Sequence, residues 1–159
     1  MQKRQASSIA LLALNIVGFG IMLGGLVALQ ASCSGANQPK EFGDGGLLDP
    51  SLTCSDFHQY QWFKVLLQGF MLLLNTLALV TGTLPAFRQT LAIFRAVSTV
   101  LLMDAANDYL SVLRTSTGGL RRDCSVFFAG LVISCVDNFL FIITFCFDVL
   151  LILCRMHSL

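Results

Sequence analysis

Residues 124–154, CSVFFAGLVISCVDNFLFIITFCFDVLLILC, form one long apolar run that contains two aspartates. A hydrophobic stretch of about 18 or more residues is typical of a helix that spans a lipid bilayer. Three further apolar runs occupy residues 8–29, 62–84 and 89–113. At about 1.5 Å per residue, each run is long enough to cross a hydrocarbon core of about 30 Å. The sequence therefore predicts four membrane spans.

The overall composition agrees with a small membrane protein. The chain has 159 residues, of which 55% are hydrophobic and 12% are charged, and charged residues make up about 25% of a typical soluble domain. A net charge of +1 provides no basic field that would attract nucleic acid. We expect a single all-α transmembrane domain over residues 1–159, in contact with the lipid bilayer, and no nucleic-acid partner.

The connections between the runs predict how the helices are arranged. Residues 30–61 form the one long loop, rich in glycine and in acidic residues. The other two connections, around residues 85–88 and 115–123, are short. Short connections make consecutive helices antiparallel neighbours. We therefore predict an antiparallel, up-down-up-down four-helix bundle.

The amino terminus and the long loop bear on orientation. Lys3 and Arg4 before an apolar run resemble a secretory signal, but the run is longer than the apolar core of about 7–15 residues in such signals, so we expect an uncleaved first span. Basic residues are equally numerous on the two sides of the predicted bundle, so they do not decide its orientation. The loop contains Cys33 and Cys54, which would form a disulfide in an oxidising compartment and would otherwise be two free thiols. This candidate disulfide and the acidic loop favour both termini in the cytoplasm.

Acidic residues inside the last two runs are the main functional clue, because ionisable groups in a membrane span are costly. In 124–154, polar and small residues recur every three or four positions and so share one helix face: Gly130, Ser134, Asp137, Phe141, Thr144 and Asp148. Run 89–113 has a similar stripe of Val97, Leu101, Asp104, Asp108 and Ser111. We expect both stripes to face the bundle interior or a partner protein, with Gly130 and Ser134 allowing close helix packing.

Matched depth in the bilayer predicts partners for two of these acids. Lys64 lies at a depth similar to that of Asp108, and Arg95 at a depth similar to that of Asp148. Opposite charges at one depth reduce the cost of burying either. Alternatively, Arg95 extends its side chain to the headgroups.

Asp104 and Asp137 lie deepest and have no evident basic partner in the sequence. A lone carboxyl group at that depth is expected to be protonated, because desolvation disfavours its charged form. One interpretation is a proton or cation relay. The other is a neutral carboxyl group that bonds an asparagine or a backbone carbonyl and holds the helices in register. The apolar runs lack the breaks that transporter sites use, which favours the structural role.

Run 8–29 contains Gly20 and Gly24, a small-xxx-small pair that lets another helix approach closely. The partner is either a helix of the same bundle or a second copy of the chain. Asn15 lies on the same run and is expected to hydrogen-bond across that contact.

Known enzymatic and metal-binding motifs are missing from the sequence. The chain has two histidines, no Cys-x-x-Cys motif and no glycine-rich phosphate loop. We therefore expect a non-enzymatic protein without metal or cofactor. Cys154, next to Arg155 at the predicted membrane edge, is a candidate for lipidation.

Short segments resemble the MARVEL and Casparian-strip-like group of tetraspan membrane proteins. They are Asp104-Ala-Ala-Asn-Asp108 in the third span, and Arg121-Arg122-Asp123-Cys124 with Phe128-Ala-Gly130 at the entry to the fourth. The resemblance implies a non-catalytic protein that organises membrane domains or vesicle traffic by lateral association.

Three functions are consistent with the sequence. The first is a scaffold that organises membrane assemblies by binding copies of itself or other membrane proteins. The second is a small accessory subunit of a larger membrane complex. The third is a proton- or ion-handling transporter that uses Asp104 and Asp137.

Overall fold

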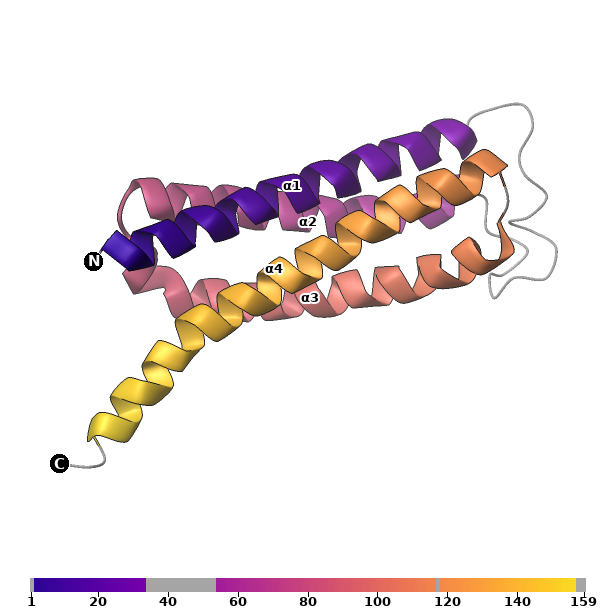
Figure 1. Cartoon of the computed structure of the whole chain (residues 1–159). Coiled ribbons are helices and arrows are strands. Elements are labelled where there is room, and N and C mark those ends of the chain that lie inside the picture. Colours follow the sequence, from indigo (N-terminus) through magenta and orange to yellow (C-terminus); the bar gives the residue numbers. More distant parts are fainter. Residues whose placement is uncertain (1, 34–53, 117, 157–159) are drawn as a thin grey trace.

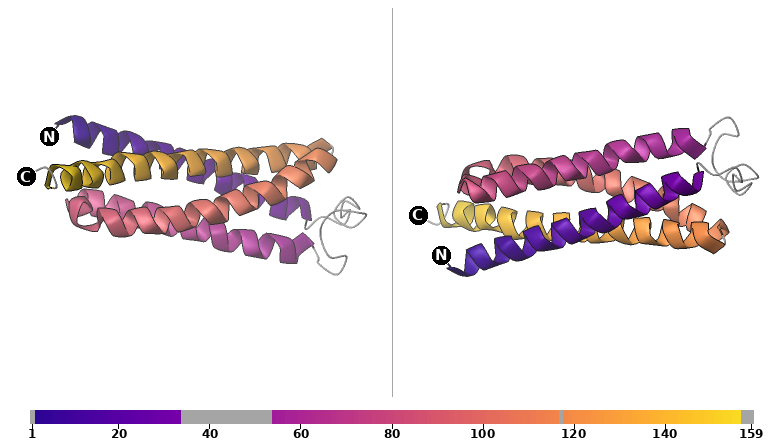
Figure 2. Two further views of the ribbon diagram at one scale, coloured as in Figure 1. Left: turned by 90° about the horizontal axis from the view of Figure 1, so that it is seen from below. Right: turned by 90° about the horizontal axis from the view of Figure 1, so that it is seen from above.

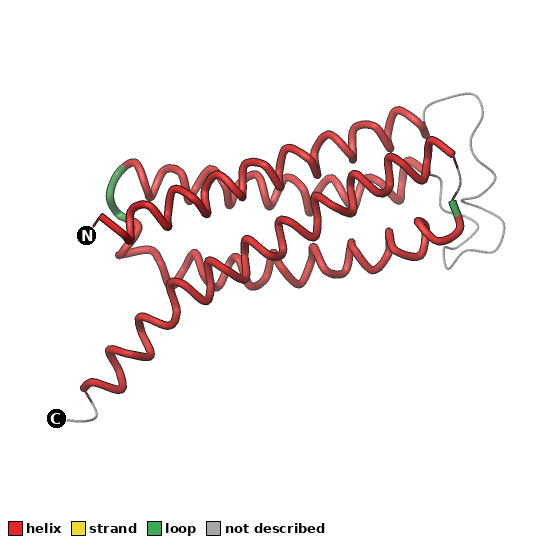
Figure 3. Tube along the Cα trace, in the orientation of Figure 1, coloured by secondary structure: helices red, strands yellow, loops and turns green. Residues whose placement is uncertain are grey.

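The chain folds into four long helices, seen in a computed structural model that describes residues 2–33, 54–116 and 118–156. The helices are α1 (Gln2–Cys33), α2 (Cys54–Val80), α3 (Leu84–Thr115) and α4 (Gly118–Met156). They run side by side with alternating direction (Figures 1 and 2). The main contacts join α1 to α2, α2 to α3, α3 to α4 and α1 to α4, so the helices form a closed ring around one interior. The predicted antiparallel four-helix bundle is confirmed, and the described chain contains helices and turns but no strand (Figure 3).

Each helix contains a segment that is long and apolar enough to cross a membrane. These segments are Ser7–Ser32, His58–Val80, Leu84–Arg114 and Gly118–Thr144. The chain is thus a multi-pass integral membrane protein. The start of α1 and the end of α4 lie at the same end of the bundle, and the last turns of α4 lean away from the other helices (Figure 1).

The turn between α2 and α3 lies earlier than predicted. We expected it around residues 85–88, but α2 ends at Val80 and α3 begins at Leu84. Gly82 has a φ of 71°, a left-handed conformation that glycine adopts without strain. Pro85 lies in the first turn of α3, where a missing N–H costs no helical hydrogen bond. The proline therefore starts a helix here instead of marking the turn.

The other two connections are also shorter than predicted. α1 continues to Cys33 and α2 already begins at Cys54, so the ends of the expected loop 30–61 are helical. α4 begins at Gly118, inside the expected turn 115–123.

Glycines set the closest helix contact, which joins α1 to α4. A Cβ atom added to Gly25 would lie 2.6 Å from the Cα of Phe127, and one added to Gly130 would overlap the backbone of Met22. Added Cβ atoms at Gly20 and Gly24 would meet no atom within 4 Å. Gly20 and Gly24 therefore do not form a contact within the described bundle, and their use against a second copy stays a prediction.

The apolar core is divided into two clusters. One includes Met22, Leu26, Leu102 and Phe127 and lies toward the end of the bundle where α3 meets α4. The other consists of Met71, Ala78, Leu84, Leu91 and Phe141 and lies toward the end where α2 meets α3. On α2, α3 and α4, most of the buried residues between the two clusters are polar, as described below.

Replacing Gly130 by alanine is expected to lower the free energy of unfolding by about 1–3 kcal/mol, because the new methyl group overlaps backbone that has no room to move. Gly24→Ala is the matched control and should leave stability unchanged or slightly higher, since alanine is the better helix former. Thermal unfolding of the purified protein in detergent measures both. Equal losses in the two variants would contradict the close α1–α4 contact.

Candidate functional site

A layer of buried polar side chains crosses the bundle between the two apolar clusters. All four helices contribute to it, and each of these residues is buried: Asn15 from α1, Gln68 from α2, Arg95 and Ser98 from α3, and Asp137 and Asn138 from α4. The interior of a bundle in lipid normally consists of apolar and small residues. A polar layer drawn from every helix is therefore a distinctive feature.

An ion pair forms the centre of this layer. Arg95 Nη1 donates a hydrogen bond of 2.7 Å to Asp137 Oδ2, and both side chains are fully buried. Asn15 Nδ2 donates to the same oxygen at 2.6 Å. Arg95 Nη1 also lies 3.2 Å from Asn138 Oδ1. Because arginine keeps its charge in proteins, its partner Asp137 is expected to be ionised.

Neutral side chains extend the network from this ion pair. Ser98 Oγ donates to Gln68 Oε1 at 2.7 Å, and Asn138 Nδ2 donates to the same oxygen at 3.4 Å. Gln68 Nε2 donates a long bond of 3.5 Å to Asn15 Oδ1. Hydrogen bonds thus connect all four helices at one level.

The layer lies near the middle of the membrane spans. Asn15 is eight residues inside Ser7–Ser32, and Arg95 is eleven residues inside Leu84–Arg114. At 1.5 Å per residue these offsets are about 12 and 16 Å. A hydrocarbon core is about 30 Å thick, so the ion pair lies well inside the spans, where a charge is costly.

Several polar atoms around the ion pair have no hydrogen-bond partner. They are Nε and Nη2 of Arg95, Oδ1 of Asp137 and Oγ of Ser134. The Phe141 ring covers the guanidinium group, with its centroid 4.1 Å from Cζ. The layer therefore retains unused hydrogen-bonding capacity on both charged groups.

A second ion pair lies between α2 and α3, nearer the other end of the bundle. Lys64 Nζ donates to Asp104 Oδ2 at 2.7 Å, but the Asp104 side chain is 55% exposed whereas that of Lys64 is buried. Lys64 Nζ also lies 4.5 Å from the centre of the Tyr60 ring. Asp108, one turn from Asp104, hydrogen-bonds Gln61.

The inward face of α2 carries polar residues along its length, among the buried apolar residues Val65, Met71 and Ala78. Buried polar residues recur on it every three, four or seven positions: His58, Gln61, Lys64, Gln68 and Asn75. At the first of these, His58 Nδ1 lies 2.8 Å from the Tyr109 hydroxyl. The outward face carries exposed Phe63, Leu66, Phe70, Leu73 and Leu77. This helix therefore presents large apolar residues on its outward face and keeps its buried polar residues toward the bundle interior.

The predicted pairing of charges was wrong. Asp104 and Asp137 were expected to lack a basic partner, yet Lys64 pairs with Asp104 and Arg95 with Asp137. Lys64 was assigned to Asp108, one helical turn away. Depth alone could not separate these choices, because the rotation of each helix decides which residue of a turn faces its neighbour.

The stripe of α3 that was predicted to face the bundle interior or a partner protein does not face the interior, and its use against a partner stays a prediction. Val97, Asp104 and Ser111 are exposed, and Leu101 and Asp108 are partly exposed. The buried face instead carries Leu91, Ala92, Arg95, Ser98, Thr99, Leu102, Ala105 and Tyr109. The arginine faces inward because Asp137 compensates its charge there. On α4, by contrast, Gly130, Ser134, Asp137 and Phe141 are buried, whereas Thr144 is exposed.

The polar face of α2 was missed in the sequence. We started the second span at residue 62, which assigned His58 and Gln61 to a loop. The spacing of Gln61, Lys64, Gln68 and Asn75 in a run of apolar residues is the signal that indicates this face.

Some predicted sites lie outside the described side chains. These are the candidate disulfide of Cys33 and Cys54, the acid Asp148 and the lipidation candidate Cys154. Among the side chains that are described, no three of the types His, Cys, Asp and Glu lie together in a way that could hold a metal ion.

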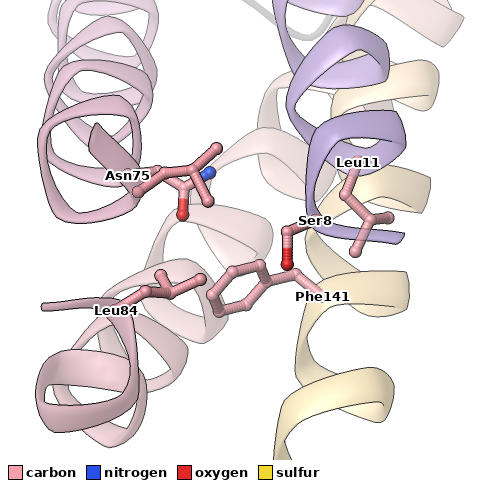
Figure 4. Close-up of a pocket in the computed structure, with 6 residues that line it drawn as sticks. Ser8, Leu11, Asn75, Leu84 and Phe141 are labelled. Carbon is pink, nitrogen blue, oxygen red and sulfur yellow. The ribbon is translucent and has the colours of Figure 1, made fainter. Parts of the chain in front are cut away.

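A small pocket lies next to the polar layer, toward the end of the bundle that holds the start of α1 (Figure 4). It is too narrow for a water molecule, and its lining consists of Ser8, Leu11, Asn75, Leu79, Leu84 and Phe141. Phe141 also contacts the Arg95 guanidinium group. The pocket and the ion pair therefore share this ring as a wall, and the Asn75 Oδ1 atom is a further buried acceptor without a partner.

Comparison with known proteins gives a likeness in fold. No family model and no curated protein sequence matches the chain. The crystal structure of the Chlamydomonas reinhardtii LCI1 channel matches with a TM-score of 0.73 and 20% sequence identity, over 87% of this chain and 93% of that chain. At this identity the likeness establishes a shared four-helix membrane fold. The resemblance to the MARVEL group is not tested by these comparisons and stays a prediction.

Asp137→Asn is expected to destabilise the protein more than Asp104→Asn does. Removing one partner of a fully buried pair costs about 3–5 kcal/mol, because the other charge stays buried without compensation. In the second pair the Asp104 side chain is 55% exposed, although Lys64 is buried, so its replacement is expected to cost less than that of Asp137. Unfolding of both variants in the same detergent compares the two pairs. A loss at Asp104 as large as that at Asp137 would contradict the assignment of Asp137 to the central ion pair.

Proposed function

We propose that the protein conducts protons or a small ion through its polar interior. The observation that carries this proposal is the buried layer centred on Arg95 and Asp137, which places two charges near the middle of the membrane. Charged groups at that depth normally mark ion pathways or proton relays. The similarity in fold to a protein described as a channel supports transport over the scaffold and accessory-subunit alternatives.

The inward polar face of α2 provides a route on either side of the layer. His58, Gln61 and Lys64 lead from one end of the bundle to Gln68 in the layer, and Asn75 follows beyond it. These side chains offer hydrogen-bonding groups at intervals of about one or two helical turns. An ion or proton would therefore meet polar partners at several levels of the span.

The described bundle represents a closed state in this proposal. The pocket is too narrow for water, and Phe141, which lines it, also covers the Arg95 guanidinium group. Conduction would require movement of Phe141 and exchange of hydrogen bonds in the layer. The unused atoms of Arg95, Asp137 and Ser134 provide alternative partners for such an exchange.

Asp137→Asn is expected to abolish ion flux into liposomes that contain the purified protein. Without the carboxylate, Arg95 is an uncompensated positive charge, which repels cations and protons and holds anions too tightly to release them. Flux is measured with a pH-sensitive dye inside the vesicles and with ion gradients across the membrane.

The matched control for this measurement is Asp123→Asn, which removes an acid at the start of α4, outside the polar layer and the inward face of α2, and should retain most of the flux. Unchanged flux in the Asp137 variant would contradict the proposed route, and no flux in the unmodified protein would refute the function itself.

Phe141→Ala is expected to raise flux, because it removes the ring that lines the pocket and covers the Arg95 guanidinium group. Phe127→Ala is a control of equal size: Phe127 is also buried, but it belongs to the other apolar cluster and packs edge-on against Tyr109. Both variants leave a cavity of similar size and so are expected to lose stability. An equal change of flux in the two would contradict a specific role of Phe141.

A further inference from the structure

The guanidinium group of Arg95 has two edges, and the structure uses them differently. Nη1 is occupied by Asp137 and Asn138. Nε and Nη2, which together form the side edge of the planar group, are fully buried and have no partner. One complete pair of parallel donors is therefore free near the middle of the membrane.

A free edge of this kind is costly without a ligand. Buried hydrogen-bond donors that lack a partner cost about 1–3 kcal/mol, and more when they belong to a charged group. Natural interiors leave few such groups, and each requires an explanation. Here two adjacent donors of Arg95, Nε and Nη2, have no acceptor. The nearby oxygens of Asn138 and Gln68 accept hydrogen bonds from other donors, Arg95 Nη1 and Asn138 Nδ2.

The geometry of the free edge defines what fits it. Two parallel N–H groups in one plane match two oxygen atoms of a planar oxyanion, as in arginine–carboxylate pairs. A spherical anion such as chloride engages the same edge without this match. We propose that Nε and Nη2 of Arg95 bind a small planar oxyanion of the carboxylate or nitrate type as the transported species; this inference rests on the proposed function.

Asp137 makes this binding weak enough for transport. With the anion at the side edge, Arg95 is shared between two negative groups, and repulsion between them favours release of the anion. A conducted ion must bind well enough to enter and weakly enough to leave. The carboxylate of Asp137 therefore acts as an internal competitor that the arriving anion partly displaces.

The neighbouring groups are consistent with this exchange. Asn15 donates to Asp137 Oδ2, while Asp137 Oδ1 is unpaired. If the anion pairs with Arg95 and so weakens the attraction between Arg95 and Asp137, the hydrogen bond from Asn15 still stabilises the Asp137 carboxylate. The second basic group of the described interior, Lys64, pairs with Asp104 and carries no planar pair of donors.

The test compares nitrate and formate with chloride at equal ionic strength, using thermal unfolding of the full-length protein in detergent. Nitrate and formate differ in their general effects on protein stability, but both are planar oxyanions. The expected result is saturable stabilisation by both anions relative to chloride. This stabilisation should be lost in Arg95→Lys, which keeps the charge and removes the pair of parallel N–H donors.

The affinity of the Asp137→Asn variant for nitrate is the decisive measurement. Because this substitution removes the competing charge, the variant should bind nitrate about tenfold or more tightly than the unmodified protein, which corresponds to a change of about 1.4 kcal/mol or more. Asp104→Asn is the matched control and should bind nitrate as the unmodified protein does. Equal affinities in the two aspartate variants, or equal effects of nitrate and chloride, would overturn the proposal.

The binding test is separate from the transport test. Planar anions that bind through Arg95 in a protein without ion flux would leave the site intact and refute the proposed function. Flux that shows no preference for planar anions and does not depend on the parallel N–H donors of Arg95 would support the proposed function and refute this inference. If Arg95→Lys does not fold, the comparison of the two aspartate variants still decides.

Discussion

Burial of the Arg95 side chain near the middle of a membrane bundle is the constraint to which the other helices respond. A guanidinium group does not lose its charge in proteins, so its surroundings must supply a counter-charge and acceptors. Asp137 provides the charge, and Asn138 provides an oxygen. Asn15 then holds the carboxylate from α1, and Gln68 links α2 to the same group of side chains. One costly charge thus fixes the rotation and register of all four helices.

The same constraint explains why buried polar side chains lie between the two apolar clusters of the interior, while the exterior is apolar. In lipid, apolar side chains gain little by leaving the membrane for the bundle interior, so packing and hydrogen bonds drive helix association. Close packing is provided where Gly25 and Gly130 bring α1 and α4 together. Hydrogen bonding is provided by the polar face of α2, whose outward residues remain apolar. The two apolar clusters then isolate the polar layer from both ends.

Sequence reasoning predicted the parts that depend on local properties. Span number and antiparallel order follow from hydropathy and connection length, and both were found. The turn before α3 was misplaced because Pro85 has two possible roles, and only the conformation of Gly82 distinguishes them. The charge pairs were misassigned because they depend on how each helix is rotated about its axis. That rotation is decided jointly: Arg95 turns α3 inward toward Asp137, which leaves Asp104 at the outer surface beside Lys64. No single run of sequence contains this information.

The incomplete use of hydrogen bonds in this layer is the feature that supports the proposed function over a purely structural role. A network in which every donor and acceptor is paired resists rearrangement, because each change leaves a buried group unsatisfied. Here Arg95 keeps one edge, Asp137 keeps one oxygen and Ser134 keeps its hydroxyl without partners in the described bundle. A ligand that enters can therefore form bonds before existing ones break, which lowers the barrier to exchange. A layer that served only to hold four helices in register would gain stability by satisfying these atoms, so their availability favours a role in moving an ion.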